Sequence, residues 1–255
     1  MRIVVTIYEE TSEDALRSIR EVRGGDMVEL RAEKLGAIDF AALRAATSKP
    51  IILTHRGVAV DDATLFRALE AGIDFVDVEW RPDLTLSLPR ERVVLSHHDY
   101  QGMSGEADAM RALGCAYAKL AVTPKTLDEN LELLSIKGIT VIGMGERGLY
   151  SRILAPFFGS ELAFVGNAAP GQISLEKALA IYGDPRENLS ATHVFAIAGN
   201  PAGHSLSPTI HNPLFREKGV DAAYTIASFE TFAEIADAFE RGDIRGLSIT
   251  APFEE

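Results

Sequence analysis

Charged side chains occupy positions where a buried strand would carry apolar ones. Lys119 lies in the apolar run at residues 116–122, and an apolar, partly dry surrounding disfavours the charged ammonium. The neutral amine is a nucleophile that can form a Schiff base with a carbonyl substrate. A lysine exposed on the rim of a strand is the alternative interpretation. The same placement recurs at Glu29, Arg31, Arg56 and His98, while Asp77 and Glu79 share one face of another apolar run.

Two adjacent histidines, His97 and His98, precede Asp99 at the end of an apolar run. An imidazole that titrates near neutrality can move protons beside an imine. Adjacent residues of a strand face opposite ways, so only one of the two can point inward, and alternation alone does not say which. The His-His-Asp sequence also suggests a metal site, but tandem ligands on opposite faces chelate poorly and no cysteine cluster accompanies them. We therefore expect no metal.

Strand-like and helix-like segments alternate over the first part of the chain. The apolar runs are residues 3–7, 27–31, 51–56, 75–80, 93–98, 116–122, 139–144 and 162–165, and helical patterns cover residues 12–23, 61–71, 107–113 and 127–137. A strand followed by a helix, repeated, is typical of a parallel sheet, and eight repeats favour closure into a (β/α)8 TIM barrel. The charged residues lie toward the C-terminal ends of their strands. Because active sites of this fold are built at those ends, five such residues together indicate a binding site.

A turn-rich polar stretch at residues 182–188 predicts a domain boundary, with a barrel over residues 1–187 and a second domain over 192–255. The second domain has a strand, helix, strand, helix, strand pattern at residues 193–199, 208–218, 223–227, 232–241 and 246–250. This is a partial α/β domain. A piece this small is marginally stable alone, so we expect it to lean on the barrel or on a second chain, which leaves a homodimer open.

Composition excludes several classes of protein. The 25 Lys and Arg against 37 Asp and Glu give a net charge of −12, and 47% of residues are hydrophobic. An acidic, well-cored chain repels phosphate backbones and anionic lipid, so neither nucleic acid nor a membrane is the expected partner; a small molecule is. The single cysteine, Cys115, forms no internal disulfide, and the first apolar run is too short for a signal peptide. These features predict a cytoplasmic protein.

Six short motifs follow one another along residues 1–185. They are Glu29-Leu30-Arg31, Arg56, Ser96-His97-His98-Asp99-Tyr100, Lys119 with Thr123-Pro124, Met144 with Ser151-Arg152, and Ala169-Pro170-Gly171-Gln172. In this order they resemble the type I 3-dehydroquinate dehydratases. The resemblance implies a lyase of the shikimate pathway that converts 3-dehydroquinate to 3-dehydroshikimate and needs no cofactor or metal.

The same resemblance implies roles for individual residues. Lys119 forms the imine with the substrate ketone, His98 is the general acid and base because it directly precedes the Asp-aromatic pair, and Glu29 helps to orient His98. Substrate contacts are implied for Arg31, Arg56, Arg152 and Gln172, with Arg152 on the carboxylate and Gln172 closing the site from its loop. Ala168 stands where family members usually have a serine, which puts one hydroxyl contact in doubt.

The second domain resembles the start of shikimate dehydrogenase. Residues 198–201, 203–208 and 210–212 carry the stronger match, and residues 247–253 a weaker one. The resemblance implies that Ser205, Ser207 and Thr250 bind shikimate. Glu254 stands where that family has its catalytic lysine, and the chain ends before a nucleotide-binding domain, so dehydrogenase activity is not expected. The Ser205-Leu206-Ser207-Pro208 sequence is also typical of a simple helix start.

Three alternatives stay open. The barrel could be another Schiff-base lyase or aldolase for keto acids, the second domain could be a shikimate-binding or assembly module, and the chain could be a fragment of a longer bifunctional enzyme. Residues 143–148 also spell G-x-G-x-x-G after a strand, which is typical of a dinucleotide site. The position of this motif at the seventh strand, and the lack of an acidic residue about 20 positions on, favour a barrel loop.

Overall fold

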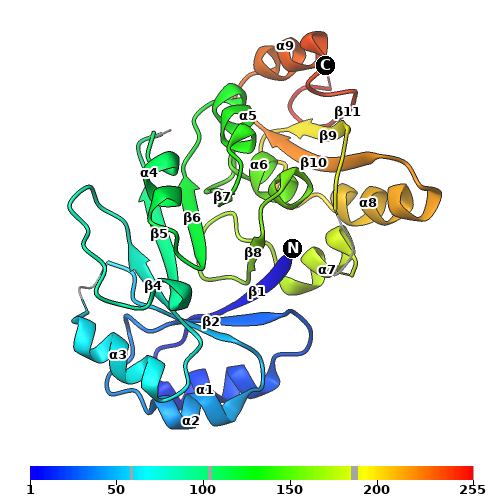
Figure 1. The fold of residues 1–255 in the computed structure, drawn as a ribbon. Helices are drawn as coiled ribbons and strands as arrows, with labels where there is room; N and C mark the ends of the chain where they lie inside the picture. The colour runs from blue at the N-terminus through cyan, green and yellow to red at the C-terminus, as the bar shows by residue number, and fades with distance from the viewer. Residues whose placement is uncertain (58–59, 103–104, 185–188, 255) are drawn as a thin grey trace.

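The computed structural model describes residues 1–57, 60–102, 105–184 and 189–254. Its larger sheet has eight parallel strands with helices outside them, and its smaller sheet has three parallel strands (Figure 1). The predicted fold class, a TIM-like barrel followed by a small α/β unit, is therefore confirmed. The predicted boundary at residues 182–188 lies partly outside the described residues, because these omit 185–188.

The barrel strands run in chain order around the sheet, with β8 beside β1. They are β1 (Arg2–Ile7), β2 (Met27–Arg31), β3 (Ile51–Thr54), β4 (Phe75–Glu79), β5 (Val93–Asp99), β6 (Tyr117–Val122), β7 (Thr140–Gly143) and β8 (Leu162–Val165). Strands β7 and β8 are joined by a hydrogen bond of 3.2 Å from the Leu162 amide to the Thr140 hydroxyl. All eight strands lie at the predicted positions.

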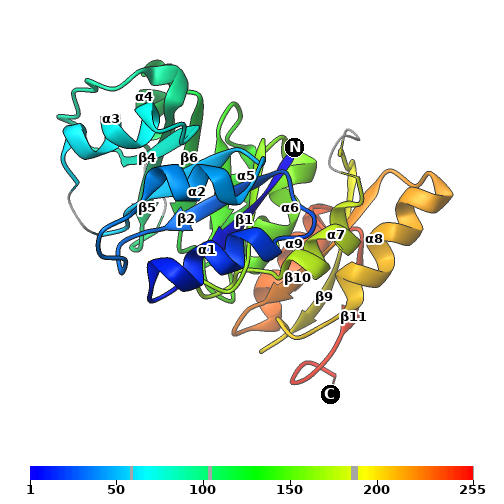
Figure 2. The same ribbon diagram turned by 90° about the horizontal axis from the view of Figure 1, so that it is seen from below.

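Helices follow most of these strands and cover the outside of the sheet (Figure 2). They are α1 (Ser12–Glu21), α2 (Phe40–Ala46), α3 (Asp62–Glu70), α4 (Ala107–Ala112), α5 (Leu127–Ser135), α6 (Leu149–Leu154) and α7 (Leu175–Tyr182), with single 3-10 turns at Arg90–Arg92 and Ala155–Phe158. Side-chain oxygens accept the amides of the first turn in five of them, from Thr11, Asp39, Asp61, Thr126 and Ser174.

Strand alternation divides the barrel core into two clusters. Outward residues such as Ile3 and Leu95 pack against the helices, whereas a smaller inward cluster that includes Val4, Val94 and Phe164 fills the barrel. Inward positions nearer the C-terminal strand ends carry polar residues instead. Because side chains two apart share a face, each polar inward residue follows an apolar one that anchors its strand.

The second unit consists of β9 (His193–Gly199), α8 (Ser207–Lys218), β10 (Ala222–Ser228), α9 (Phe232–Arg241) and β11 (Gly246–Ile249). Strand β10 is at one edge of the sheet, in the order β10-β9-β11, yet all seven of its residues are buried. The reason is that β10 contacts α6 of the barrel as well as α8, and α8 also packs on α7 (Figures 1 and 2). The second unit therefore packs against the barrel, as expected for so small a domain.

Buried polar contacts join the two units. The Thr225 hydroxyl, with no exposed surface, donates to the Tyr150 carbonyl of α6 at 3.0 Å. Arg216 of α8 donates to the Ala180 carbonyl of α7 at 3.0 Å. None of the described helices is long and apolar enough to cross a bilayer.

Two buried tyrosines of the barrel differ in how their hydroxyls are satisfied. The Tyr150 hydroxyl has no hydrogen-bond partner among the described residues, whereas the Tyr182 hydroxyl donates to the carbonyls of Arg152 and Ile153 at 3.4 and 3.3 Å. Removing an unpaired buried hydroxyl loses no hydrogen bond, while removing a paired one lowers the free energy of unfolding by about 1 kcal/mol. We expect Tyr150→Phe to leave the free energy of unfolding unchanged or higher and Tyr182→Phe to lower it, as measured by urea unfolding. A larger loss for Tyr150→Phe would contradict this packing.

Candidate active site

A cavity of about 410 Å³ opens at the C-terminal ends of the barrel strands. All seven residues that the sequence placed in the barrel site line this cavity: Glu29, Arg31, Arg56, His98, Lys119, Arg152 and Gln172. They come from β2, the segment after β3, β5, β6, α6 and the segment after β8. Strand alternation turns Glu29, Arg31, His98 and Lys119 inward, and the other three residues complete a space of the size that holds a small molecule.

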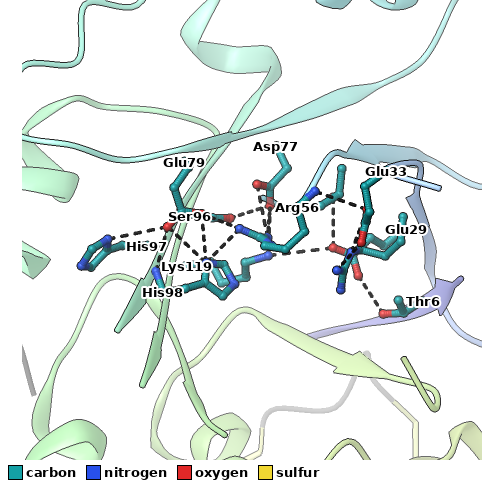
Figure 3. Close-up of polar contacts among 12 residues, drawn as sticks. Thr6, Glu29, Glu33, Arg56, Asp77, Glu79, Ser96, His97, His98 and Lys119 are labelled. Atoms are coloured by element: carbon teal, nitrogen blue, oxygen red, sulfur yellow. Dashed lines mark hydrogen bonds and ion pairs between the residues drawn. The ribbon is translucent and has the colours of Figure 1, made fainter. Parts of the chain in front are cut away.

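Lys119 is buried at the floor of the cavity, with 3% of its surface exposed. Its Nζ lies 3.0 Å from Asp77 Oδ2, 3.9 Å from Glu29 Oε1, and 4.5 Å from the centre of the Phe164 ring (Figure 3). The prediction of an apolar surrounding for Lys119 is thus correct for burial and for Phe164, but not for the two carboxylates. Burial favours a neutral amine, but two carboxylates beside it favour the ammonium form.

Asp77 is the closest charged partner of Lys119. Burial alone would raise the pKa of Asp77, but Lys119 and Arg56 outweigh this effect and lower the pKa to about 2. The Ser96 hydroxyl also donates to Asp77 Oδ2 at 2.5 Å. Asp77 and Glu79 were predicted to share one face of a strand but not to belong to the site. Their charges inside an apolar run were the sequence signal for such a role.

His98 lies against Glu79 and Arg56. Its Nδ1 is 3.0 Å from Glu79 Oε2 and 2.9 Å from an Arg56 nitrogen, and its backbone amide donates to Glu79 Oε1 at 2.9 Å. Burial lowers the pKa of His98 most, and the hydrogen bond with Glu79 raises it in part. Adjacent His97 stacks edge-on against Trp80 with ring centres 5.2 Å apart, so the structure turns His98 to the cavity.

The predicted contact between Glu29 and His98 needs correction. Glu29 accepts hydrogen bonds from the hydroxyls of Thr6 and Thr54, at 2.8 and 3.0 Å, and lies near Lys119. The carboxylate that contacts His98 belongs to Glu79 (Figure 3). The physical reason is strand order: β4, which carries Glu79, pairs directly with β5, which carries His98, whereas β2 does not.

Gln172 lies in the segment after β8 and lines the cavity from there. Its Nε2 donates to the Thr6 hydroxyl at 3.0 Å, and its Oε1 accepts the Ala168 amide at 2.9 Å. Thr6 in turn donates to Glu29, so a hydrogen-bond chain runs from this segment to the carboxylate beside Lys119. Ala168 takes part through its backbone, which needs no hydroxyl.

The arginines of the cavity differ in whether a carboxylate neutralises them. Arg31 pairs with Glu33, and Arg56 pairs with Glu79. In the described ranges Arg152 has no carboxylate within salt-bridge distance; its Nε donates to the Gly143 carbonyl at 2.8 Å. Burial lowers the pKa of Arg152 to about 10, which still leaves it charged at neutral pH. A buried cation without a counter-charge, facing a cavity, is a site for an anion.

The three residues predicted to bind shikimate lie in the second unit. The hydroxyls of Ser205 and Ser207 are 3.2 Å apart just before α8, and Thr250 follows β11 with its amide on the Ala198 carbonyl at 2.8 Å. All three are partly buried, and Glu254 is exposed in the turn beyond. The G-x-G-x-x-G motif at residues 143–148 joins β7 to α6, as expected for a barrel loop. Among the described residues, no three His, Cys, Asp or Glu side chains group to hold a metal.

Known proteins resemble the two units in family and in fold. Residues 3–187 match the family model of type I 3-dehydroquinase, and residues 197–255 match that of the shikimate dehydrogenase substrate binding domain. Similar folds occur in the type I 3-dehydroquinate dehydratase of Clostridium difficile (TM-score 0.54, 22% identity, covering 69% of this chain and 88% of that one) and in its Aquifex aeolicus counterpart (0.54, 20%, 70% and 96%).

A third solved structure resembles both units together. The dehydroquinate dehydratase and shikimate dehydrogenase from S. pombe AroM has a TM-score of 0.50 and 24% identity, and the match covers 99% of this chain but 57% of that one. The family model covers more than two thirds of the present chain, and the matched range includes all the residues that line the cavity. The chain therefore belongs to the type I 3-dehydroquinase family, with a shikimate dehydrogenase N-terminal domain after the barrel.

Proposed function

We propose that the chain dehydrates 3-dehydroquinate to 3-dehydroshikimate through an imine on Lys119. One observation carries the proposal: a buried amine, an imidazole and an arginine without a carboxylate partner line the same cavity. The substrate has a ketone, a hydroxyl group β to the ketone, and a carboxylate. The amine can bond to the ketone carbon, the imidazole can protonate the hydroxyl, and the arginine can bind the carboxylate.

The amine must first lose a proton. Asp77 Oδ2 lies 3.0 Å from Nζ, and a neighbouring base has to accept a proton before Lys119 attacks the ketone and then return it to the departing oxygen. The nitrogen then adds to the carbonyl carbon, and the oxygen leaves as water to give a protonated imine. The positive nitrogen withdraws electrons from the adjacent carbon and makes its hydrogen acidic.

His98 supplies the proton transfers of the next steps. Within the described part of the chain the hydrogen bonds of the His98 ring all use Nδ1, which leaves Nε2 for the substrate. Removal of the proton by the imidazole gives an enamine. The imidazolium returns that proton to the leaving hydroxyl, water departs, and the conjugated imine is hydrolysed to the product and free Lys119.

Arg152 binds the substrate carboxylate in this proposal. Arg31 and Arg56 already have carboxylate partners, so an added anion gains most from Arg152. Gln172 and Arg31 then border the bound ring from the other sides of the cavity. Ser205, Ser207 and Thr250 would bind shikimate in the second unit through hydroxyl hydrogen bonds, and the absence of dehydrogenase activity stays a prediction.

Lys119→Met removes the nucleophile while keeping the length of the side chain. We expect the dehydration rate to fall by at least about 10³-fold, because Lys119 is the only lysine among the described residues that line the cavity. The rate is followed by the ultraviolet absorbance of the conjugated product. Lys125→Met, which changes an exposed lysine, is the matched control and should keep the wild-type rate. Activity retained in Lys119→Met would refute the imine.

Arg152→Lys keeps the charge but replaces the planar guanidinium. The single nitrogen of lysine cannot replace both Nε on the Gly143 carbonyl and the two terminal nitrogens that can bind a carboxylate in parallel, so KM for dehydroquinate should rise about tenfold or more, with a smaller effect on kcat. Steady-state kinetics give both constants, and Arg111→Lys on α4 serves as the control. An unchanged KM would place the carboxylate elsewhere.

The pH dependence of kcat tests the role of His98. Only the neutral imidazole accepts a proton, and burial lowers the pKa of His98, so kcat should rise with pH to a plateau through a midpoint below 6.5. Glu79→Gln removes the carboxylate that partly raises this pKa, and the midpoint should move to lower pH. In His97→Phe the midpoint should stay in place. A midpoint that does not respond to Glu79→Gln would contradict the assignment.

A further inference from the structure

The loop at residues 143–148 contacts both the barrel cavity and the second unit. It carries the G-x-G-x-x-G motif, and the proposed chemistry does not use it. The two end glycines are tightly packed: a Cβ on Gly143 would lie 2.3 Å from the Gly148 carbonyl oxygen, and one on Gly148 would lie 2.4 Å from the Met144 oxygen. The glycines are therefore needed for close packing within the loop, which closes on itself.

Both ends of this loop hold Arg152. The Arg152 backbone amide donates to the Gly148 carbonyl at 2.9 Å, and the guanidinium Nε donates to the Gly143 carbonyl at 2.8 Å. The loop also touches the segment that carries Gln172, since a Cβ on Gly171 would lie 2.5 Å from the Gly145 oxygen. A shift of the loop thus moves the cation that faces the cavity.

The middle of the loop is attached to the second unit through Glu146. Its Oε1 accepts the Gly203 amide at 2.7 Å and the Ser228 hydroxyl at 3.1 Å. Ser228, which is buried at the end of β10, also accepts the Ala202 amide at 3.2 Å. A Cβ on Gly203 would lie 2.7 Å from the Glu146 carboxylate, so the absence of a side chain permits this contact.

We propose that Glu146 is a positioning residue for the dehydratase site, through which the second unit fixes the 143–148 loop and thereby Arg152. The proposal rests on the proposed function, because it concerns binding of the same substrate. It gives the second unit a role in the barrel reaction that requires no catalysis by that unit. Lys119 and His98 lie on β6 and β5 and are held by contacts with Asp77 and Glu79 of β4, so we expect KM to change more than kcat.

The test measures KM and kcat for dehydroquinate in four variants. Glu146→Ala and Ser228→Ala remove the two sides of the anchor, Glu146→Gln keeps an oxygen acceptor, and Asp128→Asn is the control. Asp128 forms an exposed ion pair with Arg241 of α9, so this variant breaks a contact between the units without touching the loop. Thermal melting followed by circular dichroism shows whether each variant is folded at the temperature of the assay.

We expect Glu146→Ala to raise KM about fivefold, which corresponds to the net contribution of one ordinary hydrogen bond, with kcat within about twofold of wild type. Ser228→Ala should raise KM less, and Glu146→Gln and Asp128→Asn should stay near the wild-type value. A wild-type KM in both Glu146→Ala and Ser228→Ala would overturn the proposal, as would an equal rise in Asp128→Asn. If Glu146→Ala does not fold, Ser228→Ala decides.

These outcomes are separate from a failure of the proposed function. If the wild-type chain forms no product from dehydroquinate, the dehydratase assignment fails and the positioning role fails with it. If the wild-type chain is active and the variants keep its KM, only the role of Glu146 fails.

Discussion

The structure of the barrel mouth depends on one buried cation, the ammonium of Lys119. A charge this deeply buried persists only if nearby groups replace its hydration, and Asp77 and Glu29 do so. Each carboxylate is in turn hydrogen-bonded, Asp77 by Ser96 and Glu29 by Thr6 and Thr54. The side chains of six adjacent strands, β1 to β6, thus converge on one nitrogen.

In the proposed mechanism, this arrangement serves Lys119 both before and after it reacts with the substrate. The ion pair stabilises the resting ammonium, and a base that removes its proton frees a nucleophile already aimed into the cavity. The carboxylates that remain can then stabilise the positive charge of a protonated imine at nearly the same position. The same electrostatic surroundings serve the resting and the covalent states.

The sequence predicted the strands, and the inward charges on them, because both follow from the alternation of side chains along a strand; Arg152 and Gln172 lie outside the strands and were predicted from the family resemblance. It did not predict which charges pair, since pairing depends on lateral strand order. Glu29 and Glu79 both point inward, but only β4 is a neighbour of β5, so Glu79 contacts His98. Helices α2, α6 and α7 lie outside the helical ranges named from the sequence; α6 is buried nearly all round, so it shows no helical period.

The second unit is bound to the barrel by a continuous interface rather than a linker alone. Strand β10 rests on α6, and α8 rests on α7, so the apolar edge of the small sheet is covered by helices of the barrel. The loop between β7 and α6 belongs to both the interface and the cavity. In this molecule, the end glycines of the G-x-G-x-x-G sequence permit close packing within the loop, and Glu146 between them contacts the second unit.

The most direct measurement is reduction of the wild-type chain with borohydride in the presence of dehydroquinate, followed by peptide mapping by mass spectrometry. The account predicts a single adduct on the peptide that contains Lys119, and none when pyruvate replaces dehydroquinate. Turnover of dehydroquinate without any adduct, or an adduct on a different lysine, would contradict it.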